Sequence, residues 1–194
     1  MERRFLDTNG VRVVVDAKVV DKDVKLPEER QTSAETLEAD TLEVLADLNH
    51  ASQKGLQTIF DSSVGRSTVN HPLGGRYQIT PTEASVQKLP VQHGVTHTTS
   101  VMAQGFNPYI AEWSPYHGAA YAVIEATARL VAAGANWSKA RFSYQEYFER
   151  MDKQAERFGQ PVAALLGSIE AQIQLGLPSI GGKDSMSGTF EELT

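Results

Sequence analysis

The most strongly marked element of the chain is Ser114-Pro-Tyr-His-Gly-Ala-Ala-Tyr-Ala-Val-Ile-Glu-Ala-Thr-Ala-Arg-Leu-Val-Ala-Ala-Gly134. A serine at the start accepts hydrogen bonds from free N–H groups of the first helical turn, and a proline fits within that turn. A glycine just past the end is typical of a helix terminus. The segment therefore predicts one long helix. Its apolar residues occupy nearly every face and are mostly alanine, so we expect it to be buried with close backbone contacts.

Further helices are expected on both sides of this element. Three segments place a hydroxyl three residues before a glutamate, which is typical of a helix start: Thr32-Ser-Ala-Glu35, Thr80-Pro-Thr-Glu83 and Ser143-Tyr-Gln-Glu146. With the apolar periodicity, they predict helices at 32–48, 81–88, 143–159 and 161–176. The last of these has its large apolar residues on one side: Val162, Leu165, Leu166, Ile169 and Ile173.

Two segments alternate as half-buried strands do, at 11–20 and 95–103. Strands separated by helices indicate the α+β class, with a mixed β-sheet layered with helices. We divide the chain into an N-terminal strand and connector at 1–31 and a main domain at 32–194, and we expect both ends to be truncated.

Composition excludes several classes of protein. The chain has 194 residues, a net charge of −6 and no cysteine. The charge argues against nucleic acid or an anionic membrane as a partner. Without cysteine there is no disulfide framework, thiolate metal site or cysteine nucleophile. No apolar run approaches the roughly 20 residues that cross a bilayer, and the N-terminus lacks a signal peptide's apolar core. We expect a soluble, cytoplasmic protein.

The strongest chemical signal is Gly181-Gly-Lys-Asp-Ser-Met-Ser-Gly188, which we interpret as a glycine-rich loop. Glycine lets backbone N–H groups approach an anion, lysine supplies a point charge, and an aspartate can hold Mg²⁺. The spacing is not that of a P-loop. An ordinary surface turn explains the same residues about equally well. The candidate phosphate ligands are Gly181, Gly182, Lys183, Asp184, Ser185 and Ser187.

Two further residues are candidate ligands. Arg66 follows Asp61-Ser-Ser-Val-Gly65 and could hold a phosphate, although a solvated arginine on a polar turn is the competing explanation. Glu125 lies inside the apolar helix, where a carboxylate needs a metal or an ionic partner. Arg129 lies one turn later and offers that partner. His93 and His97 have a zinc-like spacing, but they lie in a loop and strand, so zinc is not predicted.

Two long runs allow a resemblance to be stated. One is Gly105-Phe-Asn-Pro-Tyr-Ile-Ala-Glu-Trp-Ser-Pro-Tyr-His-Gly-Ala-Ala-Tyr-Ala-Val123, and the other is Gly181 to Gly188. Together with Ala51-Ser-Gln-Lys-Gly-Leu56 and Phe60-Asp-Ser-Ser-Val-Gly65, they resemble large-type phosphoribosylformylglycinamidine synthase, also called formylglycinamide ribonucleotide amidotransferase. The resemblance covers essentially the whole chain, with its motifs in the same order.

This resemblance implies a place in a larger enzyme. The family has two modules similar to aminoimidazole ribonucleotide synthase, followed by a glutaminase domain, and this chain resembles the N-terminal half of the second module. The family reaction converts formylglycinamide ribonucleotide, ATP and glutamine to the amidine, ADP, phosphate and glutamate. The implied role of this half is structural, with an auxiliary site for ATP or ADP and Mg²⁺, and without catalytic residues. Its implied partners are the remaining domains, or a second copy when isolated.

The same resemblance aligns Glu125 with a magnesium-binding glutamate, but one departure matters. Some relatives have an asparagine one turn after that glutamate, where this chain has Arg129. An aspartate that some relatives have near Val95 is also missing. Two rival hypotheses stay open: a stand-alone ATP-binding enzyme, and an interaction domain without a ligand.

Overall fold

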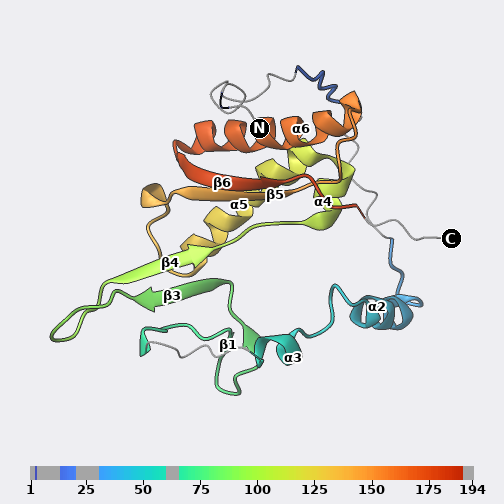
Figure 1. Cartoon of the computed structure of the whole chain (residues 1–194). Helices are drawn as coiled ribbons and strands as arrows, with labels where there is room; N and C mark the ends of the chain where they lie inside the picture. The colour runs from blue at the N-terminus through green and yellow to red at the C-terminus, as the bar shows by residue number, and fades with distance from the viewer. Residues whose placement is uncertain (1–2, 4–13, 21–30, 60–65, 190–194) are drawn as a thin grey trace. The chain divides into compact units, whose positions relative to one another are not determined.

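The computed structural model describes residues 3, 14–20, 31–59 and 66–189 (Figure 1). They fall into two compact units, and each is described by itself. The first is assembled from Met1–Lys22, Phe106–Val123 and Ser138–Thr194, and the second from Asp23–Gly105 and Ile124–Trp137. The boundary after residue 31 stays a prediction, because residues 21–30 lie outside the described part of the chain.

The helix α5 (Pro115–Ala132) confirms the most strongly marked element of the sequence. The Ser114 hydroxyl oxygen accepts a hydrogen bond from the backbone N–H of His117 at 3.4 Å. Gly134 has a φ of +81°, a conformation that glycine adopts without strain, and it ends the helix.

The burial of α5 differs from the expectation. Val123 is only 1% exposed, but Tyr121 and Ile124 are each 50% exposed. The helix therefore buries one side within this chain and not its whole circumference.

The helix α6 (Ala155–Leu175) is the longest element of the first unit, and Pro161 lies inside it. The predicted start at Pro161 is therefore wrong, whereas the predicted end at Gly176, with a φ of 66°, is confirmed. Proline removes one backbone hydrogen bond of a helix. Contacts from outside hold the preceding turn: Arg157 pairs with Asp152 at 2.7 Å, and Lys18 with Glu156 at 3.2 Å.

Small residues form the buried face of α6, namely Gly159, Pro161, Ala163, Ala164, Gly167, Ser168 and Ala171. A Cβ atom at Gly159 would collide with the carbonyl of Lys18, and one at Gly167 with that of Tyr116. The Tyr116 hydroxyl also donates to the Glu170 carboxylate. These contacts bring the start of α5 and the N-terminal segment against the backbone of α6.

The large apolar residues of α6 share one side, as predicted, but that side is exposed. Their exposed fractions run from 36% at Val162 to 74% at Ile173, with Leu165, Leu166 and Ile169 between these values. We call these five residues the α6 apolar stripe. The helix thus turns its small residues inward and its large ones outward.

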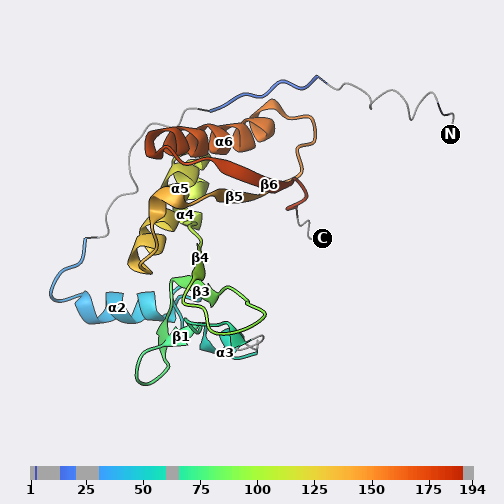
Figure 2. The ribbon, with the colours of Figure 1, turned by 90° about the vertical axis from the view of Figure 1, so that its left-hand side faces the viewer.

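The strands β5 (Phe142–Tyr147) and β6 (Ser179–Ser185) pair in parallel, and α6 is the connection between them (Figures 1 and 2). Parallel strands need such a crossover. The predicted helix at 143–159 is therefore wrong over β5. The hydroxyl-to-glutamate spacing is a local pattern, but Phe142, Tyr144 and Glu146 alternate with more exposed residues, as a half-covered strand requires.

In the second unit, β3 (Ala84–Lys88) and β4 (Thr99–Ala103) form an antiparallel pair. Ala84 and Val86 are 8% and 7% exposed, and they lie opposite Ala103 and Val101. The predicted helix at 81–88 is therefore wrong, because these alternating residues pair across a sheet. The predicted strand at 95–103 is confirmed only over β4.

Shorter elements complete the second unit. The strands β1 (Leu73–Gly74) and β2 (Thr80–Pro81) pair antiparallel, and α3 (Lys54–Gln57) precedes them. The described chain thus has three two-stranded sheets with parallel and antiparallel pairing, which confirms the α+β class. None of the helices in the described ranges has the length and apolar character that crossing a membrane requires.

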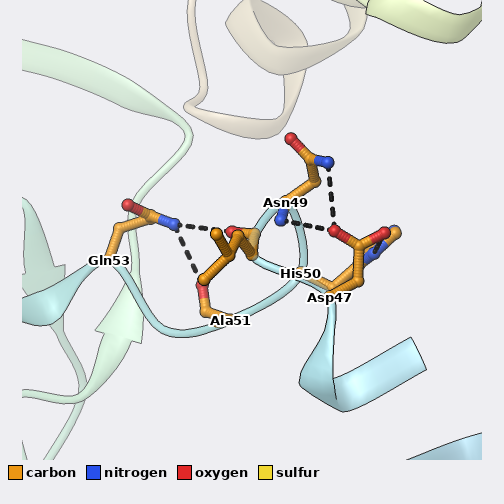
Figure 3. Close-up of polar contacts among 6 residues, drawn as sticks. Asp47, Asn49, His50, Ala51 and Gln53 are labelled. Carbon is orange, nitrogen blue, oxygen red and sulfur yellow. Dashed lines mark hydrogen bonds and ion pairs between the residues drawn. The ribbon is translucent and has the colours of Figure 1, made fainter. Parts of the chain in front are cut away.

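The helix α2 (Leu37–Ala46) confirms the helix predicted at 32–48 over its central ten residues. It ends at a polar turn (Figure 3). Asp47 accepts hydrogen bonds from the backbone N–H of Asn49 at 2.8 Å and from its side chain at 3.0 Å. The backbone bond is the largest cause of a lowered pKa of Asp47. An aspartate that bonds two residues ahead competes with helix continuation.

The N-terminal segment of the first unit differs from the sequence expectation. Residues 14–20 have no regular structure, so the strand predicted at 11–20 is wrong over these residues, and 11–13 lie outside the described residues. The N–H of Lys18 donates to Ala155 and not to a strand partner.

Prediction also missed α4 (Pro108–Trp113), although the Asn107 side chain caps it by accepting from Tyr109 and Ile110. A short 3-10 turn, η2 (Trp137–Lys139), follows α5.

Candidate functional site

Most of the predicted phosphate ligands lie on β6 and not in a loop. Gly181 to Ser185 pair with Ser143 to Tyr147 of β5, and Ser187 follows where regular structure has ended. The prediction of a loop is therefore wrong up to Ser185. Gly182 has a packing reason, because a Cβ atom there would lie 2.7 Å from the Tyr144 carbonyl oxygen. Close strand contact accounts for this glycine without a phosphate.

The strand separates the charged candidates. Successive residues of a strand point to opposite faces, so Lys183 and Asp184 face opposite ways. The Lys183 ammonium donates to the Ser185 hydroxyl at 3.0 Å, and both residues lie on the same face of β6. A phosphate could contact Lys183 and Ser185 together. A single ligand that also used Asp184 would have to reach around the strand.

The other face of this sheet carries polar groups that are not satisfied. One carboxylate oxygen of Glu146 and the hydroxyl of Tyr144 are buried, and neither has a hydrogen-bond partner among the described residues. Burial raises the pKa of Tyr144 to about 12, against a smaller opposing effect of the nearby Gln172 side chain. That amide lies near the hydroxyl, but the geometry is not that of a normal hydrogen bond.

Glu146 lies opposite Asp184 in the strand register. Burial raises the pKa of the Glu146 carboxyl, and the like charge of Asp184 raises it further. We call these residues the Glu146–Asp184 pair. Two neighbouring carboxylates can share a proton or accept a hydrogen-bond donor. Within the described ranges, no group of three or more histidine, aspartate or glutamate residues could hold a metal ion.

Arg66 belongs to the second unit, so the structure defines no distance between it and β6. It has a φ of 55° and lines a cavity of about 200 Å³ that Lys88 also lines. The next residue, Ser67, is bonded to β3: its carbonyl accepts from the N–H of Lys88 at 2.7 Å, and its hydroxyl donates to Gln87 at 2.9 Å. Two cationic side chains at one cavity are compatible with an anionic ligand.

Glu125 also lies in the second unit, and its partner is the one that the sequence offered. Its carboxylate lies 2.8 Å from the Arg129 guanidinium. A second carboxylate, of Glu83, lies 2.8 Å from the same guanidinium, which also donates to the Gln104 carbonyl at 2.9 Å. We call these four residues the Arg129 cluster. A divalent ion bound to Glu125 would have to compete with this guanidinium for the carboxylate.

A larger cavity of about 430 Å³ lies in the second unit. It is lined by Lys54, Gln57, Thr58, His71, Pro72, Leu73, Tyr77 and Gln78. The side-chain oxygen of Gln57 is buried without a hydrogen-bond partner in the part of the chain that the structure describes. Prediction from the sequence missed this cavity, since the lining residues come from separate segments with no common motif.

The comparisons with known proteins bear on the fold. No family model matches the chain, and no curated protein does. A solved structure described as PurLQS from Thermotoga maritima matches with a TM-score of 0.61 and 16% sequence identity. The match covers 91% of this chain and 24% of that one, so the chain spans about a quarter of the length of its structural neighbour. At this identity, the likeness shows that the two share a fold.

Proposed function

We propose that this chain is part of a formylglycinamide ribonucleotide amidotransferase, the ligase of purine biosynthesis that uses ATP and glutamine. The observation that carries the proposal is the fold shared with PurLQS over 91% of this chain. The segments with the sequence resemblance, Gly105 to Val123 and Gly181 to Gly188, lie largely within that fold as α4, the start of α5, and β6. Two independent kinds of likeness thus favour one family.

Within such an enzyme, we assign this piece to the N-terminal half of the second synthase-like module. Its role would be structural, with an auxiliary nucleotide held by the face of β6 that carries Lys183. Lys183 and Ser185 lie on that side and are the residues best placed to contact a phosphate. Mg²⁺ would come with the ATP or ADP, and Glu125 is not carried into this proposal as its ligand. The chemistry itself would need other parts of the enzyme.

The proposed partners are the first synthase-like module and the glutaminase domain, with a homodimer as the form of the isolated chain. The proposed location is the cytoplasm, with neither nucleic acid nor membrane as a partner. The α6 apolar stripe, with exposed fractions up to 74%, favours a protein partner. It also favours the second candidate function, an interaction domain that binds no nucleotide.

Calorimetric titration of the chain with ADP and Mg²⁺ distinguishes these functions. We expect measurable binding, and about tenfold weaker binding for Lys183→Ala, because losing one charge-assisted contact costs about 1.4 kcal/mol. Lys139→Ala is the matched control, since Lys139 lies at the end of η2 and is not part of β6. No heat with wild type would support the interaction domain. Equal affinities of wild type and Lys183→Ala would remove β6 from the site.

ATP turnover distinguishes the remaining alternative. The isolated chain is expected to hydrolyse no ATP, because the proposed role contains no catalytic residue. Turnover by purified chain, abolished by Lys183→Ala but not by Lys139→Ala, would instead establish a stand-alone ATP-dependent enzyme.

A further inference from the structure

Three acceptors converge on the side chain of Arg129. Its Nε lies 2.8 Å from Glu83, its Nη2 lies 2.8 Å from Glu125, and its Nη1 donates to the Gln104 carbonyl at 2.9 Å. Every nitrogen of the guanidinium therefore has an acceptor. The rigid, planar fork of arginine suits this arrangement, whereas a lysine ammonium could not occupy all three directions at the same separation.

The acceptors come from separate elements of the second unit. Glu125 lies one turn before Arg129 on α5, Glu83 lies directly before β3, and Gln104 lies directly after β4. Arg129 thus joins the helix to one end of the β3–β4 pair. Its side chain is only 29% exposed, so water competes less for these bonds than at an open surface.

We propose that Arg129 is a built-in cation that occupies the place of a divalent metal ion between Glu83 and Glu125. Two carboxylates together with water make an adequate Mg²⁺ site in other proteins. Here the guanidinium bonds both carboxylates, and its positive charge opposes the entry of a second cation. The cluster therefore holds α5 to the strands without metal, whether or not β6 binds a nucleotide.

Mn²⁺ is a suitable probe, because it prefers the same oxygen ligands as Mg²⁺ and broadens the NMR signals of nearby amides. With the full chain and no nucleotide, we expect no selective broadening at Glu83, Gln104 and Glu125. In Arg129→Gln the two carboxylates lose their cation. We expect Mn²⁺ to broaden those signals and to raise the melting temperature, and Glu125→Gln added to Arg129→Gln to abolish both effects.

Arg141→Gln is the matched control, since Arg141 donates only to the nearby carbonyls of Lys139 and Ala140 in the contacts described for it. It should respond to Mn²⁺ as wild type does. Arg129→Lys keeps the positive charge, and we expect it to exclude the ion as wild type does. It is the variant to test if Arg129→Gln fails to fold. Selective broadening around Glu125 in wild type would overturn the proposal. So would an Arg129→Gln protein that folds and binds no Mn²⁺, because the guanidinium would then not be what excludes the ion.

Discussion

Two pairs of carboxylates in this chain have the same chemistry and opposite surroundings. Glu83 and Glu125 both bond the Arg129 guanidinium, each at 2.8 Å. Glu146 and Asp184 lie opposite each other on parallel strands, and neither has an ion pair within the described residues. The difference teaches that a carboxylate pair stabilises a fold only through a third group. Without one, burial and like charge both oppose ionisation.

Arg129→Ala should have the largest effect on this comparison, because it makes the first pair resemble the second. It removes three charge-assisted bonds and leaves the two carboxylates without their counter-charge. We expect a loss of about 2 kcal/mol in the free energy of unfolding, the scale for such bonds at partly exposed sites. Urea denaturation measures it. A loss no larger than that of Arg141→Ala would mean that the Arg129 cluster contributes nothing specific.

Glu146→Gln should change the second pair in the opposite direction. The amide keeps the size of the side chain, removes the like charge facing Asp184, and does not have to ionise while partly buried. We expect stabilisation on the order of 1 kcal/mol at neutral pH. Glu149→Gln is the control, since Glu149 pairs with Arg157 at 3.3 Å and should lose stability if anything. Destabilisation by Glu146→Gln would show that an unrecognised donor satisfies this carboxylate.

The dependence of stability on pH is a second test of the Glu146–Asp184 pair. The pKa of Glu146 is raised above its ordinary value of 4.5, so the folded chain holds this proton more tightly than the unfolded chain. Its contribution to stability is present below pH 4.5 and is lost as pH rises through the raised pKa of Glu146. In thermal melts, the melting temperatures of wild type and Glu146→Gln should therefore be similar in acid and should differ at pH values above the raised pKa of Glu146. Parallel curves would contradict the raised pKa.

Asp184→Asn should have the smallest effect. It removes the same repulsion from the exposed side of the pair, where solvent screens the charge. We expect a gain of a few tenths of a kcal/mol, together with a lowering of the Glu146 pKa that NMR titration of its carboxyl carbon can follow. An unchanged titration of Glu146 would mean that burial alone raises the pKa of its carboxyl group.

Local signals in the sequence predicted part of the fold. The serine, proline and glycine at the ends of α5 are sufficient to define it, and Gly176 defines the end of α6. The helices predicted at 81–88 and 143–159 failed for a common reason. Their capping patterns are local, whereas the strands β3 and β5 are stabilised by partners distant in sequence, which no spacing rule shows.

The candidate site divides in the same way. Glu125 and Arg129 lie four residues apart, so their ion pair was predictable, but Glu83 and Gln104 reach the same guanidinium only through the fold. The glycines before Lys183 suggested a loop. Gly182 is instead required by the closeness of the Tyr144 carbonyl on β5. Periodicity in Phe142 to Tyr147, alternating every second residue, was the one signal that could have revealed the strand and with it Glu146.

Two glycines of α6 each lie against the backbone of another segment, and together they fix the spacing between these two contacts. Gly159 lies against the backbone of Lys18, and Gly167 lies against that of Tyr116. The rise of the helix separates these two glycines by roughly 12 Å. One residue inserted between them would rotate Gly167 by about 100° around the helix axis, and another residue's side chain would take its place at the contact. The number of residues between the two glycines is therefore more strictly constrained than the identities of those residues. Gain or loss of one residue there should be tolerated less than a substitution at any position other than the two glycines.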